Sequence, residues 1–138
     1  MESNIPTPCT WVEKPAWVSS QGAQYVEENN SYQLIASLQL GPISAAIDAN
    51  STDFMLYSSG VITDASACGT TPNHAVLVTG YNNGDTNSGL PFYHIKNSFG
   101  TTWGQDGYAM IGVQNGVGIC AIQSEPVIAN MLLSSNNL

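Results

Sequence analysis

The sequence predicts an α+β domain in which one helix is followed by a barrel-like sheet of antiparallel strands. Over residues 30–40 apolar side chains recur near i, i+3 and i+4, which indicates a helix that Gly41 and Pro42 end. From residue 43 onward, short apolar runs alternate with turn-forming residues, the pattern of successive β-strands. A helix followed by such strands favours an α+β architecture, and 138 residues suffice for one domain with its own core.

The elements follow in order along the chain. Residues 1–24 are rich in turn formers and are predicted to be extended, loop-like chain that crosses from another domain. After the helix we predict a short helical turn at 53–57, a turn-rich loop at 82–89 and frayed residues at 133–138. The predicted strands cover residues 43–47, 60–62, 74–81, 92–96, 108–113 and 119–122.

The charge balance is strongly acidic. Ten acidic residues face only Lys14 and Lys96, and the net charge is −8. Such a chain repels phosphate backbones, so we expect no nucleic-acid partner. No apolar run approaches the roughly 20 residues that span a bilayer, and no basic stretch precedes an apolar one. We therefore expect no membrane association, and no anchor or signal peptide in this chain.

Three cysteines, at positions 9, 68 and 120, make an odd count. The sequence has no Cys-x-x-Cys pair, and neither His74 nor His94 has a metal-ligand spacing with a cysteine. We therefore expect no metal and no cofactor. One disulfide with one remaining thiol is the simplest arrangement in an oxidising compartment. Sequons at Asn29 and Asn50 are compatible with secretion, although short sequons also arise by chance.

Two segments and one cysteine stand out as candidates for chemistry. Asn73-His74-Ala75 begins an apolar strand, and Cys68 lies six residues before His74. Residues 97–108 read Asn-Ser-Phe-Gly-Thr-Thr-Trp-Gly-Gln-Asp-Gly-Tyr. Taken singly each has an ordinary explanation: a histidine that begins a strand is usually structural or exposed, and an asparagine before a glycine-rich loop usually forms a turn.

Together these segments resemble the papain-like cysteine proteases. Residues 97–108 are similar to the family's Asn-Ser-Trp-Gly-x-x-Trp-Gly-x-x-Gly-Tyr signature, with Phe99 in place of the first Trp. Asn73-His74-Ala75 resembles the catalytic-histidine motif, residues 41–47 the strand that opens the right-hand domain, and residues 120–125 the cathepsin B-type ending. The resemblance runs from about residue 2 to residue 129 in the family's order. It implies a crossing segment of the left-hand domain at 1–25 and the right-hand, barrel-like domain of the papain fold at 26–138.

The resemblance also implies catalytic roles. In a Cys–His pair the imidazole takes the thiol proton, and the thiolate attacks a peptide carbonyl. His74 would be that base and later the acid that protonates the leaving amine, while Asn97 would orient its ring, as in the Cys-His-Asn variant of the triad. Phe99 would shield their hydrogen bond from water. Trp103 resembles the residue that floors the leaving-group side of the cleft.

The same resemblance implies a specificity pocket. Ala46 and Ala75 match positions that line the family's main pocket, and Asn73 lies beside them as a substrate-binding candidate. Glu125 matches the bottom of that pocket, where a carboxylate in cathepsin B-like enzymes admits Arg as well as bulky apolar side chains. The alternative, that Glu125 is an ordinary surface carboxylate, stays open.

The cysteines acquire roles by resemblance as well. Cys68 and Cys120 resemble the partners of the right-hand domain's disulfide, which closes a loop of about 50 residues and stabilises the fold by roughly 4 kcal/mol through chain entropy. Cys9 matches a cysteine that in relatives pairs with the other domain.

The family's nucleophile motif, Cys-Gly-Ser/Ala-Cys-Trp/Tyr, does not occur in the sequence. It stands roughly 130–150 residues before the histidine, which is before Met1. Cys9 is a poor substitute, because its surroundings lack the motif's glycine and small residue. We therefore expect the nucleophile, and the glutamine of the oxyanion hole, on an amino-terminal half or companion chain. Alone the chain should be inactive, and it should expose an apolar interface through which it binds that partner or itself.

Two other classes of function remain open at this stage. The chain could be a non-catalytic structural or interaction module derived from a protease half, although such a module has no reason to keep both His74 and Asn97. A carbohydrate- or ligand-binding β module is supported only by Trp11, Trp17 and Trp103, which domain packing explains better. For the protease, family membership implies a lysosomal, vacuolar or extracellular location and a peptide or protein substrate.

Overall fold

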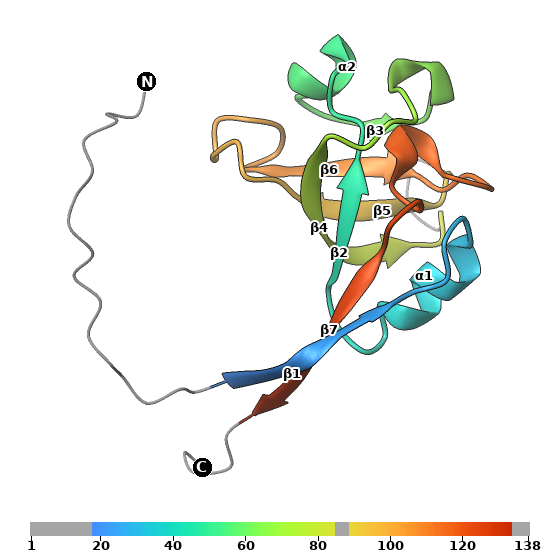
Figure 1. Ribbon diagram of the computed structural model, residues 1–138. Coiled ribbons are helices and arrows are strands. Elements are labelled where there is room, and N and C mark those ends of the chain that lie inside the picture. The colour runs from blue at the N-terminus through green and yellow to red at the C-terminus, as the bar shows by residue number, and fades with distance from the viewer. Residues whose placement is uncertain (1–17, 85–88, 134–138) are drawn as a thin grey trace.

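The computed structural model describes residues 18–84 and 89–133, in which seven strands form one sheet. The strand order is β1-β7-β2-β4-β5-β6-β3, so the sheet is open at both ends among the described residues (Figure 1). The α+β class is confirmed, and the barrel-like sheet is curved but not closed. The strands are β1 Val18–Tyr25, β2 Ile43–Ile47, β3 Val61–Ile62, β4 His74–Asn82, β5 Phe92–Lys96, β6 Tyr108–Gly112 and β7 Val127–Leu133.

Antiparallel pairing dominates the sheet, as the sequence predicts. The exception is the edge strand β3, which pairs in parallel with β6. At the centre of the sheet, Ile47 of β2 lies opposite His74 of β4, and Leu77 of β4 lies opposite Lys96 of β5. This register brings the beginning of β4 and the end of β5 to the same region of the sheet.

Short helices join the strands: α1 Ser31–Ser37 and α2 Thr52–Met55, with 3-10 helices η1 Ala65–Ala67 and η2 Ile119–Ala121. Helix α1 begins after Asn30, whose side chain accepts hydrogen bonds from the N–H groups of Tyr32 and Gln33. It is shorter than the predicted 30–40, because turns follow Ser37. Its buried apolar side chain is Leu34, whereas Tyr32 is exposed.

The predicted strand at 119–122 is wrong. Ile119–Ala121 form η2, in which Cys120 and Ala121 have left-handed φ values of 56° and 60° that no β-strand accommodates. Strands β1 and β7 were not predicted as strands. They pair with each other from Val18 opposite Leu133 to Tyr25 opposite Val127.

The assignment of residues 1–25 to a left-hand domain stays a prediction. Residues 18–25 form β1, which pairs with β7 of the sheet, and residues 1–17 lie outside the described part of the chain. The expectations for Cys9, Trp11, Lys14 and Trp17 therefore concern residues outside the description. The same is true of most of the predicted frayed end and of residues 85–88 in the predicted loop.

The core holds both apolar and polar groups. Gln123 is fully buried, accepts a hydrogen bond from the Tyr93 hydroxyl at 3.0 Å and donates one to the Gly116 carbonyl at 2.7 Å. Within the described residues, no helix is long and apolar enough to cross a membrane. The fully buried apolar side chains include Leu34, Ile43, Ile47, Phe54, Val78, Tyr93, Ile95, Ile111 and Ile122.

Candidate active site

The imidazole of His74 and the carboxamide of Asn97 lie side by side at the convergence of two strands. His74 is the first residue of β4, and Asn97 directly follows β5. His74 Nε2 and Asn97 Oδ1 are 2.8 Å apart, a hydrogen-bond distance. The antiparallel pairing of β4 with β5 produces this contact between residues 23 positions apart.

The surroundings of Asn97 fix the orientation of its amide. Asn97 Oδ1 also accepts a hydrogen bond from the Ser98 N–H at 2.7 Å. Rotating the amide by half a turn would set its NH2 group against that N–H, so the oxygen faces both donors. His74 then donates from Nε2, and in the neutral ring Nδ1 carries the free lone pair of a base. Asn97 Nδ2 is buried and has no hydrogen-bond partner among the described residues.

An aromatic cluster covers the His–Asn pair. The Phe99 ring stacks on the His74 ring, with centroids 4.9 Å apart and planes at 28°. Phe54 contacts both rings edge-on, at 6.3 Å from Phe99 and 6.5 Å from His74. Asn97 is only 8% exposed, whereas Phe99 is 45% exposed and forms the outer surface of the cluster. The Phe99 ring thus lies against the His74 ring, and its role as a shield stays a prediction.

Trp103 packs beneath this cluster. It is 8% exposed, its ring lies 5.1 Å from that of Phe54, and its indole N–H faces the carbonyl groups of Phe54 and Met55 at 3.1 and 3.2 Å. This buried indole offers little surface to a carbohydrate or other ligand, which weakens the ligand-binding alternative. Its predicted role beside a leaving group stays a prediction.

One pocket opens beside His74. It measures about 390 Å³ and contains every substrate-binding residue that the sequence suggested except Trp103. Glu125 is exposed at this pocket, and Ala46 and Ala75 are cross-strand partners that contribute only methyl groups to it. Its lining residues are Ala46, Pro72, Asn73, His74, Ala75 and Glu125.

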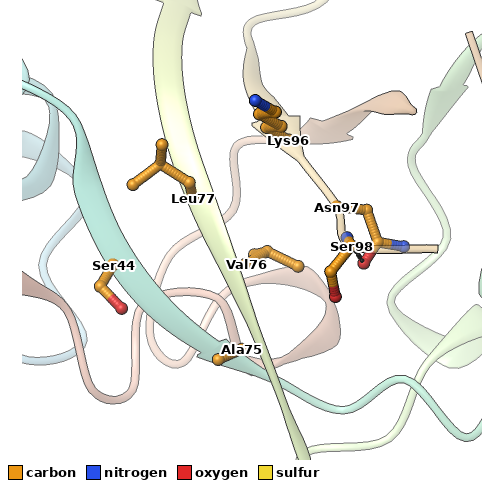
Figure 2. Close-up of a pocket in the computed structure, with 7 residues that line it drawn as sticks. All are labelled: Ser44, Ala75, Val76, Leu77, Lys96, Asn97 and Ser98. Carbon is orange, nitrogen blue, oxygen red and sulfur yellow. Dashed lines mark hydrogen bonds between the residues drawn. The ribbon is translucent and has the colours of Figure 1, made fainter. Parts of the chain in front are cut away.

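A second pocket, of about 310 Å³, opens on the other side of Ala75, toward Asn97 (Figure 2). Figure 2 shows Ser44 on β2, Ala75 to Leu77 on β4, and Lys96 to Ser98 at the end of β5. Sequence reasoning did not single out Ser44, Leu77 or Lys96. Their alternation with buried neighbours was the available signal that they face outward.

Sequence reasoning also missed Asp48, which is 7% exposed and directly follows β2. Its carboxylate accepts hydrogen bonds from the N–H groups of Asn50 and Thr71 and from the Asn73 side chain. The two backbone hydrogen bonds hold its pKa below the ordinary value, and burial opposes them only in part. A charged side chain directly after a buried strand is the one signal that could have identified it.

The structure contains the disulfide between Cys68 and Cys120 that the resemblance implied. It joins the loop that leads into β4 to η2. The Cys120 carbonyl also accepts a hydrogen bond from the Asp48 N–H at 2.8 Å. The disulfide and this hydrogen bond thus connect the loop before β4, η2 and the end of β2.

Comparison with known sequences places this geometry in context. Vignain from Ricinus communis is 39% identical over 110 residues, which cover 78% of this chain and 29% of vignain. Cathepsin J from Mus musculus is 36% identical over 124 residues, which cover 88% of this chain and 37% of cathepsin J. The chain thus spans about a third of the length of the curated relatives that it matches.

Solved structures give the same result. The bromelain protease from Ananas comosus, in complex with the E64 inhibitor, superposes with a TM-score of 0.73 at 34% identity, covering 80% of this chain and 50% of that one. The proform of the ragweed pollen allergen Amb a 11 gives a TM-score of 0.75 at 28% identity, covering 86% and 31%. The model of the papain family of cysteine proteases matches residues 4–130. The chain therefore belongs to the papain family of cysteine proteases.

Proposed function

We propose that the chain is the C-terminal part of a cysteine peptidase that hydrolyses peptide bonds by Cys-His-Asn chemistry. The observation that carries this proposal is the 2.8 Å contact between His74 Nε2 and Asn97 Oδ1 beside two open pockets. The nucleophilic cysteine belongs to an amino-terminal half or companion chain, since no papain-type cysteine motif occurs in this sequence.

In this mechanism His74 transfers protons in two steps. Nδ1 first takes the proton of the incoming thiol, and the resulting thiolate attacks the substrate carbonyl. The imidazolium then protonates the leaving amine, and water hydrolyses the thioester that remains. Because Asn97 accepts a hydrogen bond from Nε2–H in both states of the ring, it keeps Nδ1 aimed at the thiol throughout. Phe99 excludes water from that bond, which strengthens it.

The pocket beside His74 is proposed to receive a substrate side chain. Methyl-sized residues at 46 and 75 leave it roomy, and the Glu125 carboxylate offers a charge partner to an arginine side chain. Asn73 lies on the same wall and is proposed to contact the substrate there. The proposal is therefore a pocket that accepts both bulky apolar and arginine side chains.

The amino-terminal half is proposed to dock on the outward face of the central strands. A row of cross-strand partners crosses this face, from Ser44 of β2 through Leu77 and Lys96 to Tyr108 of β6. Leu77 is 37% exposed and Tyr108 is 39% exposed, so the row carries apolar surface directly beside Asn97. Burying this row against a partner would close one side of the cleft. Sedimentation of the isolated chain should accordingly show self-association, and a strictly monomeric chain that binds no apolar dye would contradict this docking proposal.

A lysosomal, vacuolar or extracellular location is proposed as well. The disulfide between Cys68 and Cys120 supports it, because disulfides persist mainly in oxidising compartments. Fractionation of the source cells, followed by detection of the chain in lysosomal or vacuolar and secreted fractions, tests the location. Detection only in the cytosol would contradict it.

The decisive experiment compares histidine variants of the native, complete protein. Intact-mass analysis first identifies a covalently linked or co-purifying segment that bears the reactive cysteine. Hydrolysis of a fluorogenic dipeptide substrate should then fall by at least about a thousandfold in His74→Ala. His94→Ala is the matched control and should keep its activity, because His94 lies on β5 and lines neither pocket. Unchanged hydrolysis by His74→Ala would overturn the proposal and favour a non-catalytic module. In the same assay the 138-residue chain alone should be inactive.

A further inference from the structure

The loop that leads into His74 is attached to the end of β2 through Asn73. The Asn73 N–H donates to the Ile47 carbonyl at 2.9 Å, and Asn73 Oδ1 accepts from the Ala49 N–H at 3.0 Å. Asn73 Nδ2 donates to Asp48 Oδ1 at 2.9 Å. The N–H, Oδ1 and Nδ2 of Asn73 are therefore hydrogen-bonded to three consecutive residues at positions 47–49. His74 directly follows this attachment point.

Asp48 supplies the part of this attachment that a side chain controls. Its two carboxylate oxygens receive three hydrogen bonds: Oδ1 from the Asn50 N–H at 3.2 Å and from Asn73, and Oδ2 from the Thr71 N–H at 3.1 Å. Its own N–H donates to the Cys120 carbonyl, which fixes its backbone to η2. A carboxylate that accepts only is suited to three donors, whereas an amide at this position would set its NH2 against one of them.

Gly69 shows that the loop is shaped around this carboxylate. A Cβ atom added to Gly69 would overlap Asp48 Oδ2, although the φ angle at Gly69 would not require glycine. The absent side chain therefore permits the carboxylate to approach the loop backbone.

We propose that Asp48 is a positioning residue for His74, acting through Asn73; this inference rests on the proposed peptidase function. Asp48 does not line either pocket beside the His–Asn pair, so its effect on the imidazole is transmitted by the loop at 69–73. In the complete enzyme it holds Nδ1 of His74 toward the thiol, while Asn97 holds the opposite side of the ring.

The first test uses the 138-residue chain, whose only histidines are His74 and His94. Ring ¹⁵N chemical shifts at fixed pH report which nitrogen of each imidazole is protonated. In Asp48→Asn the His74 resonances should move or broaden as the Nε2–H tautomer loses its dominance, while those of His94 should stay unchanged. Exchanging the two side chains, in Asp48→Asn/Asn73→Asp, restores the hydrogen bond between positions 48 and 73 but leaves the amide opposed to the Asn50 N–H, so it should recover part of the His74 signal.

Two other outcomes would overturn the inference. The His74 ring shifts could remain those of the wild type in a folded Asp48→Asn chain. Alternatively, the His94 shifts could change together with those of His74 and the exchanged double variant could fail to recover either, which indicates a general loss of structure. If Asp48→Asn does not fold, Gly69→Ala decides the question, because it displaces the carboxylate without removing its charge. Gly69→Ala should perturb His74 and spare His94, and unperturbed His74 shifts there would equally reject the role.

The second test separates this inference from the proposed function. In the complete enzyme, Asp48→Asn should lower kcat roughly tenfold or more, since small misplacements of a catalytic group are costly. If His74→Ala leaves hydrolysis unchanged, the proposed function fails whatever Asp48 does. If His74→Ala abolishes hydrolysis but Asp48→Asn keeps the wild-type kcat, the function stands and the positioning role of Asp48 fails.

Discussion

The Phe99 ring lies flat against the His74 ring, with centroids 4.9 Å apart. Residues 97–108 resemble a papain-type signature that has Trp at the position of Phe99. The chain therefore keeps an aromatic ring at this position but has no indole N–H there. We expect the stacked ring to restrict access of water to the hydrogen bond between His74 and Asn97, whose carboxamide is almost fully buried.

Removing this cover should weaken the His–Asn hydrogen bond. We expect Phe99→Ala in the complete enzyme to lower kcat/KM about tenfold, the loss that about 1.4 kcal/mol represents. Phe99→Trp is the matched control and should keep activity within about threefold, because it preserves an aromatic face. Steady-state kinetics measures both variants, and equal activity of Phe99→Ala and wild type would show that shielding is unimportant.

Glu125 should determine whether the pocket beside His74 accepts arginine. The carboxylate lines that pocket together with Ala46 and Ala75, whose methyl groups suit apolar side chains. We expect Glu125→Gln to lower kcat/KM for substrates with Arg in this pocket by about tenfold and to leave Phe substrates nearly unchanged. The measurement is the ratio of the two rates, and an unaltered ratio would mean that Glu125 is an ordinary surface carboxylate.

The central strands could be predicted because their signals are local. Residues 43–47 and 92–96 were predicted with the bounds that β2 and β5 have in the structure, since turn formers limit both runs. The run Ile-Cys-Ala-Ile at 119–122 has an equally strand-like composition. It forms a 3-10 turn instead. The disulfide of Cys120 and the hydrogen bond from the Asp48 N–H hold this turn, and because both involve distant residues, the local pattern does not reveal them.

The residues of the site also fall into those that a local motif predicts and those that depend on distant partners. His74 and Asn97 were predicted from motifs, and the structure places them within hydrogen-bond distance. Asp48 was missed because its partners at 71 and 73 are more than 20 positions away in the sequence. The pairing of β1 with β7 also depends on residues from opposite ends of the chain, and the exposed residues of β1 show little apolar pattern.

The buried Tyr93–Gln123 hydrogen bond should contribute measurably to stability. Tyr93→Phe removes the donor and leaves Gln123 Oε1 buried without it, which should lower the free energy of unfolding by about 1–3 kcal/mol. Tyr81→Phe is the matched control: the Tyr81 ring lies 6.3 Å from that of Tyr93 but is only partly buried, so its change should stay within about 0.5 kcal/mol. Urea denaturation measures both changes, and equal stabilities of the two variants would contradict the expectation.

Burial also affects the titration of Tyr93. Desolvation, with a smaller contribution from nearby Tyr81, raises the pKa of the Tyr93 phenol far above its ordinary value. The hydroxyl therefore remains a donor to Gln123 in alkaline solution while the fold persists. Ultraviolet absorbance of tyrosinate, compared between wild type and Tyr93→Phe, should show that this phenol does not ionise before unfolding. Ionisation of Tyr93 in the folded chain near the ordinary pKa would contradict this.

Acid should destabilise the fold partly through Asp48. Hydrogen bonds from the N–H groups of Asn50 and Thr71 lower its pKa in the folded chain below the ordinary 3.8, so the folded state binds this proton less readily than the unfolded state. The stabilisation is therefore complete above about pH 4 and is lost as the pH falls through the folded-state pKa. We expect wild type to be more stable than Asp48→Asn at neutral pH, and the difference to shrink as the pH falls below 3.8.

Denaturant titrations of the 138-residue chain between pH 7 and pH 2.5 measure this dependence. Asp64→Asn is the matched control, because it removes the same charge from an exposed residue whose pKa is also lowered, chiefly by the Ser66 hydroxyl. Its difference from wild type should be smaller than that of Asp48→Asn, since solvent screens an exposed carboxylate. A difference between wild type and Asp48→Asn that stays constant over the whole pH range would show that packing, and not the ionised carboxylate, joins β2 to the loop before His74.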